Sequence, residues 1–260
     1  MGSDEQFKIK QQGLYLMIIL LSPSKGMDLS ATKVVPAPTT PLFQHEADRI
    51  LSELKNCSKE ALAKFLKCSP KIAEQCHNFY HKPQPKQAAI YSYSGDVYST
   101  LQAADFNKNE LEFAQKHIII LSALYGVVRP YDTIQPYRLD FMGKFTIDAQ
   151  NLYRFWTEKV EAYFKDLNEK VVINLASTEY ARLIKNYKST CQFITPNFYD
   201  WKTDKFKIIS SFAKKARGAM ANWIIKNQIT DRAALVNFNA MGYQYNDALS
   251  QPFSPIFTRK

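Results

Sequence analysis

Glycine is scarce in this sequence, and the phosphate-binding loops that depend on glycine are missing. The chain has eight glycines in 260 residues, and none of them forms a GxGxxG or GxxxxGK[ST] pattern. Such glycines let the backbone approach a pyrophosphate or a triphosphate. The GxSxG and HExxH motifs are also missing. These absences disfavour dinucleotide-binding and P-loop chemistry.

Cysteine and histidine are equally sparse, with four of each. The cysteines form no CxxC pair, so we expect a reduced, cytoplasmic protein without disulfides or a zinc knuckle. Cys76, His77 and His81 form a CHxxxH sequence with both histidines on one helical face. No second pair of ligands has zinc spacing, so we interpret them as ordinary helix-surface residues. We predict no metal site and no cofactor.

No apolar run is long enough to cross a bilayer. The longest candidate, LYLMIILL, is too short to span and is better interpreted as a buried first strand. Residues 1–15 are polar and are expected to be a disordered extension or tag. We therefore predict one domain over residues 16–260 and no membrane association.

Positive charge, by contrast, is abundant. The chain carries 34 Lys and Arg against 24 Asp and Glu, a net charge of +10. A balance of this kind is typical of proteins held near nucleic acid, phosphate esters or a membrane surface. The alternative is a solvated basic surface that only aids solubility.

Apolar runs and helical patterns alternate along the chain, which predicts an α/β or mixed α+β domain with a mixed central sheet flanked by helices. Strands are expected at 16–21, 88–93, 118–121, 171–175, 192–194 and 206–210. Helices are expected at 43–54, 59–65, 70–80, 111–115, 153–167, 179–186 and 212–227. Residues 43–82 lack any strand signal and are predicted to form a helical hairpin subdomain between the proline-rich segments APTTP and HKPQPK.

Polar and basic turns follow several of these strands. Ser22, Ser24 and Lys25 follow the first strand, Asp96 follows a glycine turn, and Glu179 lies just beyond the strand at 171–175. Ligands commonly bind beyond the carboxyl ends of strands in open sheets.

The segment KFKIISSFAKKARGAMAN places three cations near the start of a helix, where the helix dipole disfavours them. Ser210 or Ser211 is the expected N-cap, which puts Lys214, Lys215 and Arg217 in about the first two turns. A phosphate bound by the free N–H groups, the serine hydroxyls, with Ser211 as the candidate, and the cations would offset the unfavourable position. Gly218 and Ala221 on the same face as Lys214 and Arg217 would leave it room. The alternative is that these long side chains simply extend into water.

A segment dense in Tyr, Arg and Pro, LYGVVRPYDTIQPYRLD, lies between these sites. Pro130 and Pro136 are expected to stiffen its turns and to hold Arg129 and Arg138 in place. Tyr125 and Tyr137 could stack on bases, although a role in anchoring the loop to the core is favoured.

Taken in order, SPSKGMD, SGDVYSTLQ, LSALYGVVRPYDTIQPYRLD, LYRFW, VVINLAS, KFKIIS, FAKKARG and FNAMGY resemble the YaaA family of bacterial peroxide stress proteins. The resemblance runs from Met17 to about Arg259. Three positions depart from the family pattern: Ser94 stands where lysine is usual, and Thr100 and Ala123 stand where glycine is usual.

The resemblance implies a cytoplasmic protein that limits peroxide damage from unincorporated iron and binds DNA, with a basic cleft and a helix-hairpin-helix element. The segment most similar to that element is ALAKFLKCSPKIAEQCHNFY. Its hairpin has no glycine, so Lys64, Lys67 and Lys71 would have to supply the phosphate contacts. The alternative is a plain helical hairpin with solvated lysines.

Two functions remain open from the sequence. The first is a monomeric, largely sequence-independent binder of double-stranded or structured DNA that uses the cations named above. The second is an enzyme for a phosphorylated or nucleotide-like small molecule, with Asp96 as a candidate acid or base and with Lys25 and Arg217 as phosphate ligands.

Overall fold

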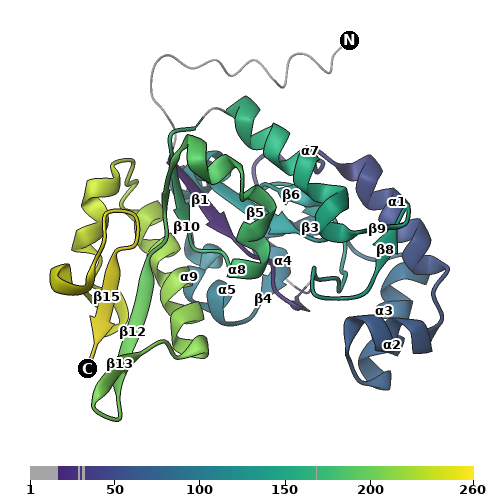
Figure 1. Ribbon diagram of the computed structural model, residues 1–260. Coiled ribbons are helices and arrows are strands. Elements are labelled where there is room, and N and C mark those ends of the chain that lie inside the picture. The colour runs from purple at the N-terminus through teal and green to yellow at the C-terminus, as the bar shows by residue number, and fades with distance from the viewer. Residues whose placement is uncertain (1–16, 29, 31–32, 168) are drawn as a thin grey trace.

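A five-stranded mixed sheet lies at the centre of the fold (Figure 1). The computed structural model describes residues 17–28, 30, 33–167 and 169–260, so the predicted extension 1–15 and Leu16 of the first predicted strand lie outside it. The strands in spatial order are β11 (Gln192–Ile194), β10 (Val171–Asn174), β1 (Met17–Leu21), β5 (Ile118–Ser122) and β6 (Gly126–Val128). The first four are parallel and β6 is antiparallel to β5, which confirms the mixed sheet.

Both faces of this sheet are covered, because every residue of β1 and β5 is buried. The runs MIILL and IIILS are continuous rather than alternating, as expected for parallel strands that helices cover on both sides. A polar turn follows β1 at residues 22–25, Ser177 follows β10, and the parallel pairing of these strands places both turns at one edge of the sheet.

A second, four-stranded sheet forms an arm at the left of Figure 1. Its strands in spatial order are β13 (Lys205–Lys207), β12 (Asn197–Lys202), β15 (Ile256–Arg259) and β14 (Gln244–Tyr245). The buried Asp200 carboxylate joins them, accepting hydrogen bonds from Tyr243 Oη at 2.8 Å and Arg259 Nε at 2.7 Å. The Arg259 guanidinium also lies over the Tyr243 and Phe212 rings, 4.6 and 4.8 Å from their centroids.

Three two-stranded ladders complete the β structure. They pair β2 (Gly26–Met27) with β4 (Tyr93–Ser94), β3 (Gln87–Ala88) with β7 (Thr133–Ile134), and β8 (Thr146–Ile147) with β9 (Gln150–Asn151).

The helices surround the central sheet and extend into a second arm made of α2 and α3 (Figure 1). They are α1 (Gln44–Lys55), α2 (Lys59–Leu66), α3 (Pro70–His81), α4 (Ala89–Ser92), α5 (Asp96–Leu101), α6 (Lys108–His117), α7 (Leu152–Leu167), α8 (Thr178–Ala181) and α9 (Ser210–Lys226). Short 3-10 turns lie at Ala103–Asp105, Arg182–Ile184, Tyr187–Thr190, Arg232–Asn237, Ala240–Gly242 and Asp247–Leu249. Helix α9 packs against α5 and also against β12, so it joins the central part of the molecule to the arm.

Some predicted elements are wrong. The expected strand 88–93 is instead β3, the short helix α4 and β4, because the backbone N–H groups of Ala89 and Ile90 donate to Asp132 and Pro130 in a neighbouring loop. The strand expected to reach Ser210 ends at Lys207, and the helix expected over 179–186 is a single α-helical turn followed by a 3-10 turn.

The apolar residues of the central sheet and of the arm form one hydrophobic cluster, which includes Ile18, Ile120, Phe198 and Phe257. Within the described part of the chain, no helix has both the length and the apolar character needed to span a membrane.

Candidate functional site

The turns that follow β1 and β10 meet at the carboxyl edge of the central sheet. The Ser177 backbone N–H donates to Ser22 Oγ at 2.9 Å, and the two hydroxyl oxygens are 3.3 Å apart. Tyr98 of α5 donates its hydroxyl to the Ser22 carbonyl at 2.8 Å. Three segments far apart in the sequence are therefore fixed together at the strand ends.

The loop 22–28 is also packed closely on the turn that begins α5. Gly95 has a φ of +113°, which a side chain would strain, and an added Cβ would lie 3.0 Å from Ser24 Oγ. The ladder of β2 and β4 holds the other side of this turn. Lys25 thus projects from a backbone that is constrained on both sides.

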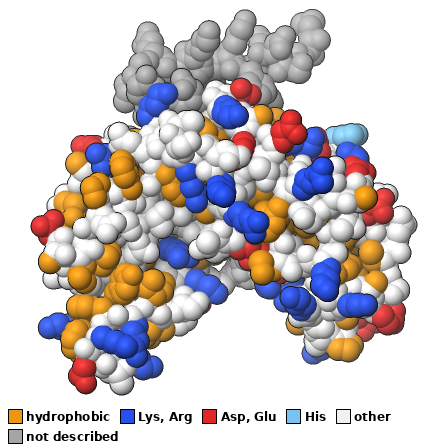
Figure 2. Space-filling model, viewed as in Figure 1, with side chains coloured by type: hydrophobic (Ala, Val, Ile, Leu, Met, Phe, Trp, Pro, Cys, Tyr) orange, Lys and Arg blue, Asp and Glu red, His pale blue; other side chains and the backbone are white. Residues whose placement is uncertain are grey.

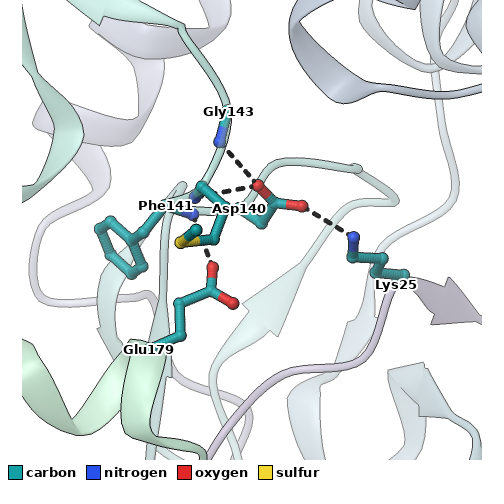
Figure 3. Close-up of polar contacts among 6 residues, drawn as sticks. Lys25, Asp140, Phe141, Gly143 and Glu179 are labelled. Atoms are coloured by element: carbon teal, nitrogen blue, oxygen red, sulfur yellow. Dashed lines mark hydrogen bonds and ion pairs between the residues drawn. The ribbon is translucent and has the colours of Figure 1, made fainter.

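Lys25 and two carboxylates form a charged cluster, which we call the strand-end cluster (Figure 3). Lys25 Nζ is 2.9 Å from Asp140 Oδ2. The other oxygen, Asp140 Oδ1, accepts from the backbone N–H groups of Met142 and Gly143 at 3.1 and 3.0 Å. Because the backbone occupies one oxygen, the second is directed to the lysine. The Lys25 side chain is 61% exposed and that of Asp140 only 14%, so the amine is accessible while its partner is not.

Glu179 of α8 is the third member of the strand-end cluster. Its Oε1 accepts from the Phe141 backbone N–H at 3.0 Å, and Tyr153 donates its hydroxyl to the Glu179 carbonyl at 2.9 Å. Partial burial, with the charge of Asp140 nearby, raises the pKa of the Glu179 carboxyl group. A carboxyl group of this kind exchanges a proton closer to neutral pH than an exposed glutamate does.

The start of α9 differs from the prediction at its cap. The N-cap is Ile209 and receives no side-chain hydrogen bond, so Ser210 and Ser211 are the first helical residues rather than caps. The physical reason is that the extended backbone persists to Ile209, whose carbonyl already accepts from the Ala213 N–H at 2.8 Å. No acidic residue lies in the first turn. The three cations do follow in the first turns of α9, as expected.

Arg217 is the most unusual of these cations. Its side chain is half-buried, and burial lowers the pKa of its guanidinium. Neither Arg217 nor Lys214 forms an ion pair or a side-chain hydrogen bond with any described residue. Lys215 is half-buried too, and only its backbone carbonyl is engaged, by Thr100 Oγ1 at 2.7 Å.

Gly218 and Ala221 do not make room for a ligand, so that part of the prediction is wrong. Both are buried, and a Cβ on Gly218 would lie 1.9 Å from the Val97 carbonyl oxygen. The missing side chain allows α5 and α9 to cross at close range. The crossing joins α9 to α5, whose first turn packs on the loop 22–28, since Thr100 donates to the Lys215 carbonyl and Gly95 lies against Ser24.

Asp96 is the first residue of α5 and is half-buried. Its carbonyl accepts from the hydroxyls of Ser99 and Thr100, at 3.0 and 3.1 Å. No ion pair joins Asp96 to a described cation, so its candidate role as an acid or base receives no geometric support beyond its position beside the loop 22–28.

The structure separates the two arginines of the proline-rich segment. Arg138 immediately precedes the Asp140 loop, is half-buried, and has only its backbone engaged, by Tyr80 Oη. Arg129 lies instead at the amino end of β5, where it donates to Tyr163 Oη at 2.9 Å and to the carbonyls of Lys116 and Ile118. Its cation is directed to the opposite edge of the sheet from Lys25.

Tyr125 and Tyr137 are anchors in the core. Tyr137 is buried and forms hydrogen bonds with Tyr93 and Ser122 at 2.9 and 2.8 Å. Tyr125 is buried as well, so neither ring is exposed for stacking on a base. The anchoring interpretation fits both rings.

Helices α2 and α3 pack against each other and are joined at residues 67–69. Lys67 adopts the left-handed conformation with φ of 48°, and Ser69 caps α3 by accepting from the Ile72 N–H. The three lysines of the prediction, Lys64, Lys67 and Lys71, are exposed. None of them forms an ion pair with a described acidic residue.

The molecular surface is hollowed between the two arms, and Lys and Arg side chains lie around the hollow (Figure 2). The central helix α8, which carries Glu179, lies above this region in Figure 1. His77 and His81 stack with ring centroids 3.8 Å apart. Among residues with described positions, no three His, Cys, Asp or Glu side chains are placed to hold a metal ion.

Sequence reasoning missed Asp140 entirely. The signal was present, since Asp140 precedes Phe-Met-Gly and an aspartate that accepts from N–H groups two and three residues onward is typical of such turns. Glu179 was noted only as one of the polar residues that lie beyond a strand end, without a partner or a role.

Comparison with known proteins identifies relatives over nearly the full chain. The sequence profile described as peroxide stress protein YaaA matches residues 17–249. A UPF0246 protein of Crocosphaera subtropica is 39% identical over 250 residues, which cover 94% of this chain and 100% of that protein. UPF0246 proteins of Francisella philomiragia and Teredinibacter turnerae are 35% and 38% identical, each with 94% of this chain and 100% of the relative aligned.

Proposed function

Because the chain belongs to the YaaA family of peroxide stress proteins, we propose that it acts in the peroxide stress response by binding DNA through the hollow between its arms. The membership supports the stress role. The DNA-binding role depends on the cations, and on Arg217 above all.

Arg217 carries the proposal because a half-buried guanidinium without a carboxylate partner is energetically unfavourable. A phosphate could accept two parallel hydrogen bonds from the guanidinium, which would replace the hydrogen bonds to water lost on burial. The free N–H groups at the start of α9 would face the same negative charge. Lys214, Lys215 and Arg138 also lack described carboxylate partners, and the loop that carries Lys25 packs on the start of α5, the helix that α9 crosses.

These contacts are of the phosphate type and read no base sequence, so binding should be largely independent of sequence. Double-stranded or structured DNA is the expected partner of a monomer in the cytoplasm. Lys64, Lys67 and Lys71 on the α2–α3 arm would contact phosphates at the rim. Cations that occupy phosphates also exclude free iron from them, which offers an indirect way to limit iron-dependent damage.

The test is fluorescence anisotropy of labelled duplex DNA over a salt series, with Lys214→Ala/Arg217→Ala compared with wild type. Two lost phosphate contacts should weaken binding and reduce the slope of log K against log salt by about 1.8, at about 0.9 per contact. Arg154→Ala/Lys165→Ala is the matched control, because it removes the same charge from exposed positions of α7. Equal slopes for all three proteins would overturn the role of α9.

A second candidate function is an enzyme for a phosphorylated or nucleotide-like small molecule. The strand-end cluster favours it, because an accessible amine and two fixed carboxyl groups at a sheet edge are arranged for proton transfer. Tight binding of a nucleotide with no binding of duplex DNA would select this function over the first.

A further inference from the structure

The backbone around Lys25 and the side chain of its ion-pair partner are fixed more firmly than an ordinary surface salt bridge requires. Its partner Asp140 is mostly buried and fixed by two backbone N–H groups, and the loop that carries Lys25 is constrained by Gly95 and by the β2–β4 ladder. Exposed ion pairs contribute little stability, so this amount of fixed structure around one accessible amine points to chemistry at the amine.

The surroundings limit what that chemistry can be. Among the described residues near Lys25 Nζ are two carboxyl groups, Asp140 and Glu179, which can take up and return protons. Arg138, two residues before Asp140 and without an ion pair to a described carboxylate, suits a phosphate on a substrate. A lysine amine with adjacent acid–base groups is the arrangement that forms imines with carbonyl compounds.

We propose that Lys25 is a nucleophile that forms an imine with the aldehyde of a phosphate-bearing sugar, and that the sugar is an abasic site in DNA. The proposal rests on the DNA-binding function above, which places a sugar between two bound phosphates. It assigns Lys25, Asp140 and Glu179 as catalytic residues.

The proposed reaction needs no oxidant, reductant or metal ion. Lys25 gives a proton to Asp140, and its neutral amine attacks C1′ of the ring-opened sugar while the carbonyl oxygen takes that proton from Asp140 and becomes a hydroxyl group. Asp140 then accepts a second proton from the attacking nitrogen and returns it to the hydroxyl group, which leaves as water when the C=N bond forms. Lys25 is then joined to C1′ as a protonated imine.

Strand cleavage would follow from the imine. The Glu179 carboxylate removes a proton from C2′, the electron pair forms the C2′–C3′ double bond, and the C3′–O bond breaks with loss of the 3′ phosphate. Burial and the Asp140 charge raise the pKa of Glu179, which makes its carboxylate a stronger base for this step. Water finally hydrolyses the imine and frees Lys25.

The experiment is borohydride trapping with a labelled duplex that contains one abasic site. Wild type should form a covalent adduct that peptide mass spectrometry locates at Lys25. Lys25→Arg retains a cation beside Asp140, so it should bind the duplex and lose at least 90% of the adduct. Lys55→Arg, an exposed position at the end of α1, controls for adventitious imines and should equal wild type.

Glu179→Gln separates the two steps, since it should still form the adduct but lose at least tenfold in the rate of strand cleavage. A parallel experiment replaces the duplex with a phosphorylated aldose. An adduct at Lys25 with the aldose but not with the duplex would support imine formation by Lys25 and refute DNA as the substrate that supplies the aldehyde. Binding of the duplex by wild type without any adduct at Lys25 would overturn this inference and leave the DNA-binding proposal intact. Absence of duplex binding would instead refute the proposed function.

Discussion

The Glu179 carboxyl group couples the strand-end cluster to pH. Its pKa is raised in the folded protein, so between the unfolded value, about 4.3, and the higher folded value the native state binds more protons than the unfolded state. The carboxyl group therefore contributes stability that is fully present below about pH 4 and is lost as the pH rises through the folded pKa.

Glu179→Gln removes that titration while its amide oxygen can still accept from the Phe141 N–H. We expect the free energy of unfolding of the variant, relative to wild type, to increase as the pH rises from about 4 to 7. Urea denaturation at several pH values measures this difference. A relative stability independent of pH would show that the Glu179 pKa is not raised by folding.

Single residues of the site could be predicted in part. The sequence identified four cations, because a strand end and a helix start can both be recognised from sequence. Lys25 follows a strand end, and Lys214, Lys215 and Arg217 lie at a helix start, where the helix dipole disfavours positive charge. The position of Arg129 could not be predicted, because β6 turns back antiparallel to β5 and carries it to the opposite edge of the sheet. Asp140 acquires its role only through tertiary contact with Lys25, which sequence spacing does not encode.

At the scale of elements, the crossing of α5 and α9 depends on one missing side chain. Gly218→Ala would gain up to about 1 kcal/mol in helix propensity. A Cβ only 1.9 Å from the Val97 carbonyl oxygen and 2.3 Å from Thr100 Oγ1 forces the helices apart, and overpacking typically costs about 1–3 kcal/mol. We expect net destabilisation and weaker DNA binding, because the start of α9 moves relative to Lys25.

Urea denaturation and the anisotropy assay measure the two effects of Gly218→Ala. Ser211→Ala, at an exposed position in the same helix, should change stability by less than about 0.5 kcal/mol and serves as the control for stability alone. A Gly218→Ala protein as stable as wild type would contradict the close crossing.

Elements with strong local signals were the predictable ones. The helices at 44–55, 59–66 and 70–81 carry clear periodicity and serine caps before Lys59 and Pro70, and β1, β5 and β10 are continuous apolar runs. Residues 88–93 are almost all buried whichever structure they adopt, so their pattern could not separate strand from helix. The arm strands β12, β14 and β15 were missed because their pairing is set by distant partners and by the Asp200 contacts.

At the scale of the whole molecule, the two sheets share one hydrophobic cluster and are joined by α9. A chain of 260 residues exceeds the size at which two-state unfolding is usual, so the arm could open separately. Because the arm and the central sheet share one hydrophobic cluster, we expect them to unfold together. We expect backbone amides of β1 and of β15 to exchange with solvent through openings whose free energies agree within about 1 kcal/mol.

Hydrogen exchange followed by mass spectrometry over a urea series measures both openings. A β15 opening several kcal/mol easier than that of β1 would show that the arm is an independent unit. In that case the position of α9 would depend on the arm, and so would the phosphate contacts proposed for Lys214 and Arg217.

The place of β15 in the arm also matters during synthesis on the ribosome. β15 lies between β12 and β14, and its pairing of Ile256 with Asn197 spans 59 positions (256 − 197). A nascent chain therefore presents β12 with an unpaired edge, and with Asp200 lacking Arg259, until nearly all of these residues have been translated. A premature stop codon before Ile256 would leave that edge open to aggregation and to quality-control proteases, even with every residue of the proposed DNA-binding surface present.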